Sequence, residues 1–376
     1  MSREENRKNF SKYVSQNILG MIGFSCYVLA DSYFISIAKG ADGLTALNLV
    51  MPLYSIIFSI GEMIGVGSAI RYAIGKIKKD ADADDYFWNA IIWCILSSIL
   101  FVFAGIFFSA DIMRVLGADE HIVAVGNNYT KIFMCFAPMF MCNYVTNAFV
   151  RNDGAPGIAM SATLFSSLFN IVFDYILMFP MNLGMEGAAL ATALSPIIGM
   201  GICSIHFFSK KSSVRLVVCK PSVRKLVAGS QLGVSAFVGE MSSAVITLAF
   251  NFVILKLAGN VGVAAYGVVA NIAIVTTAVF NGVAQGSQPL ISSCFGRGDK
   301  DGCTQLKRMG YTTAFVLAAV MYSILFIFAG QFVAVFNSEG SEMLRIYATE
   351  GVKLYFIGIF FAGINIVGGG AFSATE

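Results

Sequence analysis

Long apolar stretches alternate with short polar segments along the whole chain. Each stretch has more than about 20 residues, enough to cross a hydrocarbon core of about 30 Å at about 1.5 Å per residue. The pattern predicts ten membrane helices, at 14–38, 44–70, 87–109, 123–149, 155–180, 187–208, 229–257, 262–291, 311–336 and 347–372. We therefore expect an all-α, polytopic membrane helix bundle.

Composition and charge support a membrane protein and orient it. Hydrophobic residues make up 57% of the chain and charged residues only 12%, with a mean hydropathy of +0.75. Soluble domains carry about a quarter charged residues. The net charge is +3, and 19 of the 25 lysines and arginines fall on the side that holds the N-terminus. The positive-inside rule makes that side cytosolic, and no nucleic-acid partner is indicated.

Motifs of enzyme and metal chemistry do not occur in the sequence. The eight cysteines show no paired metal-ligand spacing, so neither a disulfide framework nor a zinc site is indicated. No HExxH, GxSxG or GxxxxGKS/T motif is found, which argues against the common hydrolases and against an ATP-driven motor. We expect neither an enzyme nor a resident cofactor.

The two halves of the chain repeat at an offset of 219 residues. The segment KGADGLTALNLV at 39–50 aligns with AGNVGVAAYGVV at 258–269, and Gly67-Ser68 aligns with Gly286-Ser287. Six spans lie within one offset, so the copies share one orientation and form a parallel repeat. The predicted parts are a cytosolic tail (1–13), an N-lobe of spans 1–6 (14–208), a basic inter-lobe loop (209–228) and a C-lobe of spans 7–10 (229–376). The second copy stops after its fourth span, so we expect two C-terminal spans of a twelve-span chain to be missing, although a natural ten-span form stays open.

Ionisable and polar side chains inside the apolar stretches are the candidate site. Asn170 and Asp174 are four residues apart and share one helical face, and Asp31 and Thr192 lie at similar depths in their own spans, about 8 to 15 Å from the same side. A charge at such depth costs about 2.5 to 3.5 kcal/mol, so it faces a polar partner rather than lipid. Two close carboxylates share a proton or hold a cation, which makes sodium and protons the candidate ligands. The alternatives are a structural acid at Asp31, an interhelical clamp at Asn170 and Asp174, and a backbone-bonded Thr192 hydroxyl.

At these residues the sequence resembles the multidrug and toxic compound extrusion (MATE) family, in its DinF-like prokaryotic branch. The resemblance rests on VLADSYFISIAKG, the helix with Pro52, NIVFD followed by GAALATALS, and QGSQPLISSCFGRGD. It implies two six-helix lobes in a V and alternating access driven by inward sodium or proton movement. It also implies that Asp31, Asn170, Asp174 and Thr192 form the cation site of the N-lobe.

Polar residues of the second half are candidates for binding substrate. Glu240 resembles an acid of the seventh span in another MATE branch, but the Asp that this branch carries on the tenth span is absent from 347–372. Glu240 is thus a candidate contact for a cationic substrate, with helix packing as the alternative. The further candidates are Tyr266, Asn271, Gln285 and Gln288, for which hydrogen bonds between helices are the alternative.

Taken together, these features predict a sodium- or proton-coupled antiporter that exports amphipathic, often cationic, drugs and toxins. We expect a monomer in the bacterial inner membrane, with its N-terminus in the cytosol. The alternatives are a flippase for lipid-linked saccharides, which needs a basic cavity that these spans do not offer, and a membrane protein without transport activity.

Overall fold

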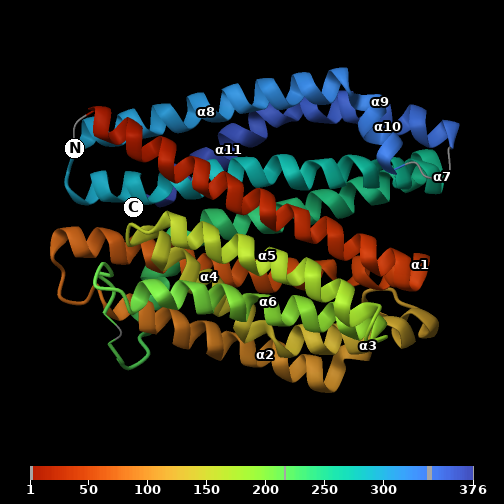
Figure 1. Ribbon diagram of the computed structural model, residues 1–376, viewed down its shortest axis with the longest axis horizontal. Coiled ribbons are helices and arrows are strands. Elements are labelled where there is room, and N and C mark those ends of the chain that lie inside the picture. Colours follow the sequence, from red (N-terminus) through yellow and green to blue (C-terminus); the bar gives the residue numbers. More distant parts are fainter. Residues whose placement is uncertain (1–2, 216, 337–340, 376) are drawn as a thin grey trace.

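The computed structural model describes residues 3–215, 217–336 and 341–375, which are almost entirely helical (Figure 1). Residues 1–2, 216, 337–340 and 376, which belong to the predicted tail, loop and C-lobe, lie outside the described residues. The helices in chain order are α1 (Arg3–Lys78), α2 (Asp85–Val115), α3 (Glu120–Cys135), α4 (Ala137–Asn152), α5 (Pro156–Met178), α6 (Gly184–Phe207), α7 (Val223–Gly296), α8 (Lys300–Ile327), α9 (Ala329–Phe336), α10 (Glu342–Tyr355), a 3₁₀ turn (Phe356–Gly358) and α11 (Ile359–Ser373).

The 219-residue repeat is visible in the backbone. Both α1 and α7 are pairs of helices joined at a glycine, Gly40 in α1 and Gly259 in α7, and these two positions are 219 residues apart. Their φ angles are 59° and 60°, a conformation that glycine adopts without the penalty paid by other residues. A glycine with positive φ therefore turns the chain between the first and second helix of each half.

The predicted spans correspond to helices, with one bend. Among the described residues, eight helices are long and apolar enough to cross a membrane, and the bent pair α3 and α4 makes a ninth. The predicted span 229–257 is helical as the first part of α7 but is not among these nine, so the expected count of ten is not reached on the described residues. The predicted span 123–149 is bent by 46° next to Pro138, because proline removes a backbone hydrogen bond.

Buried apolar side chains form two main cores that correspond to the two halves of the chain. The first gathers residues of α1 to α6, and the second gathers residues of α7 to α11. The starts of the two long helices are exchanged: Phe10 and Val14 of α1 belong to the second core, and Leu232 of α7 belongs to the first. In Figure 1 the start of α1, in red, runs diagonally between the two groups of helices.

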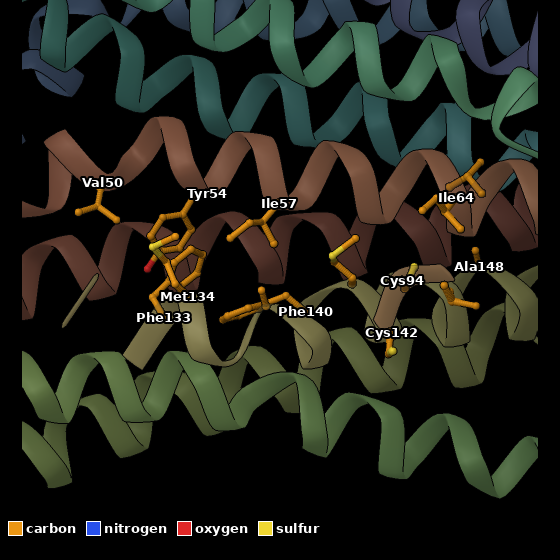
Figure 2. Packing of buried hydrophobic residues seen from close by; sticks show 14 of the residues in the cluster. Val50, Tyr54, Ile57, Ile64, Cys94, Phe133, Met134, Phe140, Cys142 and Ala148 are labelled. Atoms are coloured by element: carbon orange, nitrogen blue, oxygen red, sulfur yellow. The ribbon is translucent and has the colours of Figure 1, made fainter. Parts of the chain in front are cut away.

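Packing of the first core follows the helical period. Val50, Tyr54, Ile57 and Ile64 repeat along one face of the second part of α1, and Figure 2 shows this row facing side chains that come from the bend between α3 and α4. The Tyr54 ring stacks on that of Phe133, with centroids 3.7 Å apart. This packing fixes the second part of α1 against the bent pair.

Glycines bring α1 and α7 into backbone contact near the start of α7. A Cβ atom on Gly67 would lie 2.0 Å from the carbonyl oxygen of Gly229, and one on Gly233 would lie 2.0 Å from the carbonyl oxygen of Met63. No side chain fits at such distances. The two helices approach this closely only because Gly67, Gly229 and Gly233 have no side chains.

A second glycine contact mirrors the first. A Cβ atom on Gly286, the repeat counterpart of Gly67, would lie 2.7 Å from the Cα atom of Val14. One on Gly282 would lie 2.6 Å from the Cα atom of Ile18. The start of α1 thus crosses the second part of α7 as the start of α7 crosses the second part of α1. We call these two contacts the glycine crossings.

The segment between the lobes is tied to the first half of the chain through Asp153. This carboxylate accepts hydrogen bonds from the Tyr72 hydroxyl (2.9 Å), the Ser212 hydroxyl (3.2 Å) and the Ser213 backbone N–H (2.8 Å). His206 Nε2 lies 2.8 Å from Asp153 Oδ2, and both side chains are almost fully buried. The beginning of the inter-lobe segment is therefore an ordered part of the first half.

The glycine crossings predict a cost for any side chain at Gly67. We expect Gly67→Ala to lower stability by about 1 to 3 kcal/mol, because the added methyl group forces two backbones apart. The measurement is the midpoint of thermal unfolding in detergent. Gly267→Ala is the matched control, since a Cβ there meets no atom within 4 Å. Equal melting temperatures for wild type and Gly67→Ala would contradict the crossing.

The Asp153 contacts predict protection of the inter-lobe segment. Asp153→Ala removes the acceptor for Tyr72, Ser212 and Ser213, so we expect trypsin to cut after Lys210 and Lys211 several-fold faster than in wild type. Limited proteolysis followed by mass spectrometry of the fragments measures this rate. Asp301→Ala, at an exposed position of α8, is the control and should leave the rate unchanged. An unchanged rate in Asp153→Ala would show that the anchor is not what orders the segment.

Candidate functional site

The four residues of the predicted cation site are all buried in the same half of the molecule. Asp31 comes from the first part of α1, Asn170 and Asp174 from α5, and Thr192 from α6. Their exposed fractions are 6%, 0%, 0% and 2%. Three helices therefore deliver two carboxylates, an amide and a hydroxyl into the protein interior rather than to lipid.

Hydrogen bonds join the three residues of α5 and α6. The Asn170 amide lies 3.2 Å from the Thr192 hydroxyl. In the amide orientation that gives both of its ends a complementary partner, Nδ2 donates to Asp174 Oδ2 (3.0 Å), and the oxygen accepts from the Thr192 backbone N–H and hydroxyl (both 3.2 Å). The one-turn spacing of Asn170 and Asp174 thus places the amide between Asp174 and the neighbouring helix.

The two acids interact electrostatically, but one carboxylate oxygen of each has no hydrogen bond among the described residues. Asp31 and Asp174 lie close enough to influence one another electrostatically. The Oδ1 atom of each is buried without a hydrogen-bond partner among the described residues. An unpartnered buried carboxylate oxygen is costly, and two neighbouring carboxylates do not both remain charged cheaply. A proton or a bound cation relieves both penalties.

Three tyrosines that the sequence did not single out interact with these acids. Tyr27, Tyr54 and Tyr129 each interact electrostatically with both Asp31 and Asp174. The hydroxyl groups of Tyr54 and Tyr129 are hydrogen-bonded to each other inside the protein. Tyrosines within apolar spans carry no distinctive spacing, so the only available signal was their polar tip on an otherwise apolar face.

The donor set suits a hard cation or a proton. Carboxylate, amide and hydroxyl oxygens are the ligands of sodium-like ions, whereas softer metals prefer sulfur or imidazole. Among the described residues no group of three or more His, Cys, Asp or Glu side chains could hold a metal ion. A hollow of about 390 Å³, lined by residues that include Ile37, Met178 and Leu183, opens where the first part of α1 ends, beside the end of α5 and the start of α6. Met178 lies one helical turn beyond Asp174, so this hollow is close to the acids.

The predicted substrate residues do not converge on one place. Tyr266 and Gln285 lie 19 residues apart on α7, which is about 28 Å along a helix, and a small molecule cannot touch both. Tyr266 is buried and stacks on Phe250, with ring centroids 5.3 Å apart, and Tyr355 meets it edge to face at 6.2 Å. Asn271 is half-buried.

The other predicted substrate residues lie near the glycine crossings. Gln288 is 5% exposed, and its Oε1 atom has no partner among the described residues. Gln285 is hydrogen-bonded to Arg151 and Glu62, two residues of the first half of the chain. Glu240 is half-buried and interacts electrostatically with Glu62. In the structure the Glu62 carboxylate thus accepts a hydrogen bond from Gln285 and interacts with a second acid, Glu240, of the other half.

Comparison with known proteins agrees with this architecture. The family model MatE matches residues 17–176 and 236–376. The multidrug export protein MepA of Staphylococcus saprophyticus is 25% identical over 361 residues, covering 92% of this chain and 78% of that protein. MepA of Staphylococcus aureus MRSA252 is 26% identical over 336 residues, covering 89% and 72%.

Solved structures share the fold. An outward-facing multidrug resistance MATE transporter of the MOP superfamily superposes with a TM-score of 0.86 at 21% identity, over 98% of this chain and 84% of that one. A MOP superfamily transporter from Pyrococcus furiosus gives 0.86 at 20% identity, over 98% and 85%. The match of the family model to most of the sequence, together with this fold, shows that the chain belongs to the MATE family of membrane transporters.

Proposed function

We propose that this chain exports amphipathic, often cationic, small molecules across a bacterial cell membrane in exchange for inward sodium ions or protons. The export of drugs is supported by the curated relatives, which are named multidrug export proteins. The coupling to an ion is supported by one observation above all, the pair of buried carboxylates whose Oδ1 atoms find no hydrogen-bond partner in the described part of the chain.

In this proposal the coupling ion binds between Asp31 and Asp174. Asn170 holds Asp174 in place through its hydrogen bond, and Thr192 holds Asn170 from the next helix. A proton or sodium ion neutralises part of the negative charge in the site, which lowers the cost of burying the two acids together. The empty, charged site favours hydration and hence an arrangement of α1, α5 and α6 that water can reach. Ion occupancy therefore changes the relative stability of two arrangements.

Substrate contact is proposed for the second half of the chain. Glu240 would supply a negative charge for a cationic substrate, and Tyr266 with its ring partners Phe250 and Tyr355 would supply apolar, aromatic surface. Aromatic faces attract cations and flat rings, which fits molecules that are both charged and amphipathic. These are two separate contacts, because Glu240 interacts with Glu62 beside Gln285, whereas Tyr266 lies about 28 Å from Gln285 along α7.

The coupling site predicts loss of gradient-driven transport when either acid is neutralised. We expect Asp31→Asn and Asp174→Asn each to lower dye efflux by about tenfold or more, the range of a typical coupling free energy, because the site no longer changes charge. The measurement is transport in proteoliposomes with the sodium and pH gradients imposed separately. Asp111→Asn, which removes an exposed carboxylate paired with Arg114, is the control and should transport normally. Full gradient-dependent efflux in both site variants would rule out these acids as the coupling site.

The role of Glu240 predicts a selective loss of affinity. We expect Glu240→Gln to weaken binding of a cationic dye such as ethidium by about tenfold, the equivalent of one charge-assisted contact, and to leave a neutral dye of similar size almost unaffected. Fluorescence polarisation with purified protein measures both. Glu350→Gln, at an exposed position of α10, is the control. An equal change for the cationic and neutral dyes would assign Glu240 to helix packing instead.

A further inference from the structure

A hydrogen-bonded bridge connects the two halves of the chain beside the glycine crossings. Gln285 lies on the second part of α7, next to Val283 and Ala284 of the second core. Its Oε1 atom accepts a hydrogen bond from Arg151 Nη1 at 2.6 Å, and its Nε2 atom donates to Glu62 Oε1 at 3.3 Å. One amide of the second half thus meets a cation and an anion of the first half.

The chemistry of an amide fits this position better than any charged group would. The carbonyl oxygen of Gln285 faces the guanidinium of Arg151, and its NH₂ group faces the carboxylate of Glu62, so each end contacts the charge that it stabilises. An acidic residue here would repel Glu62, and a basic one would repel Arg151. The bridge therefore depends on a neutral side chain that both donates and accepts.

Burial makes the bridge costly to lose. Arg151 is only 4% exposed; besides Gln285 it contacts Asn17 Oδ1, at 3.4 Å, and it interacts electrostatically with Glu62. Its Nε atom has no partner among the described residues. Arg151, Asn17 and Gln285 line a cavity of about 20 Å³, which is room for about one water molecule. If the two halves separate here without water entering, the guanidinium keeps Asn17 and the attraction of Glu62 but loses its 2.6 Å hydrogen bond to Gln285.

We propose that Arg151, Gln285 and Glu62 form a latch that holds the two lobes together at the glycine crossings and that must open in each transport cycle. The crossings themselves are backbone contacts between apolar helices, so directional interactions at this interface come from side chains: the latch at one crossing, and at the other a hydrogen bond from Arg71 Nε to the Ala228 carbonyl oxygen at 3.1 Å. Gln285 is in this sense a positioning residue for the conformational change, not a contact for substrate.

The acidic end of the latch also lies near the proposed substrate contact. Glu62 and Glu240 influence each other electrostatically, and they come from opposite halves of the chain. A charge that neutralises Glu240 or Glu62 therefore changes how strongly Glu62 holds the Gln285 amide. This link to substrate rests on the proposed function, whereas the latch itself does not.

The latch is tested by measuring the separation of the lobes directly. Spin labels at Lys211→Cys, on the segment anchored to Asp153, and at Lys300→Cys, the first residue of α8, report the separation of the two halves. The start of α8 lies at the end of the molecule where α1 begins (Figure 1). Reactive native cysteines are replaced by serine. Pulsed electron paramagnetic resonance in liposomes then gives the ratio of separated to closed populations, whether or not the protein transports.

We expect Gln285→Met, which keeps the size of the side chain and removes both hydrogen bonds, to raise that ratio by about tenfold, as for the loss of a charge-assisted hydrogen bond. Gln16→Met is the matched control: Gln16 packs on Gly157 of α5 within the first half, and its Oε1 atom has no hydrogen-bond partner among the residues that the structure describes. Arg151→Met added to Gln285→Met should raise the ratio no further, because the pair acts as a unit.

If Gln285→Met does not fold, Glu62→Gln tests the latch in its place. This variant retains an acceptor for Gln285 but removes the charge, so the ratio should rise by a smaller factor than in Gln285→Met. A ratio equal to wild type in both Gln285→Met and Glu62→Gln would overturn the latch. So would an equal rise in Gln16→Met, which would assign the effect to loosened packing.

Discussion

The backbone contact of α1 with α7 is the constraint on which the rest of this transporter depends. At Gly67 and Gly233 the two helices approach to a distance at which any side chain collides with a carbonyl group, and at Gly282 and Gly286 the repeat produces the same contact again. Lipid tails cover apolar helix surface as favourably as another helix does, so the hydrophobic effect does not hold membrane helices together. Close van der Waals packing is one of the few attractive interactions that remain. The crossings thereby decide where the two cores meet and why each core contains the start of the other half's first helix.

The first part of α1 connects the two polar centres of the molecule. Asp31 lies on it near Asp174 of α5, and Asn17 lies on it beside Arg151, 14 residues or about 21 Å away along the helix. The acid cluster is built within one lobe, whereas Arg151 and Glu62 meet Gln285 across the two lobes. A movement of this helix therefore involves both the carboxylates and the lobe interface, which is the kind of shared rigid element that coupling between distant sites requires.

Sequence patterns predicted the fold well because each one reflects a local physical rule. Apolar runs gave the spans, and the 219-residue offset was confirmed by the matching breaks at Gly40 and Gly259. The bend beside Pro138 follows from the same kind of rule. The exchange of Phe10 and Leu232 between the cores was not predicted, since nothing in an apolar helix indicates which neighbour it packs against.

The candidate site shows where sequence reasoning ends. Equal depth and one-turn spacing were enough to predict that Asn170, Asp174 and Thr192 lie together, and the structure joins them by hydrogen bonds. Their role in ion coupling stays a prediction. Gln285 was placed with the substrate residues, whereas its hydrogen bonds are with Arg151 and Glu62. Arg151 itself was one of the 19 basic residues assigned to the cytosolic side, because charge alone does not reveal that a guanidinium is buried.

The most direct test of the central claim is ion binding to the purified protein, measured without any transport. Binding of radioactive sodium, and proton release on adding sodium or substrate, are compared between wild type and the Asp31→Asn, Asp174→Asn double variant. Our account predicts that wild type binds sodium or exchanges protons and that the double variant does neither. Undiminished sodium binding or proton exchange in the double variant would contradict it.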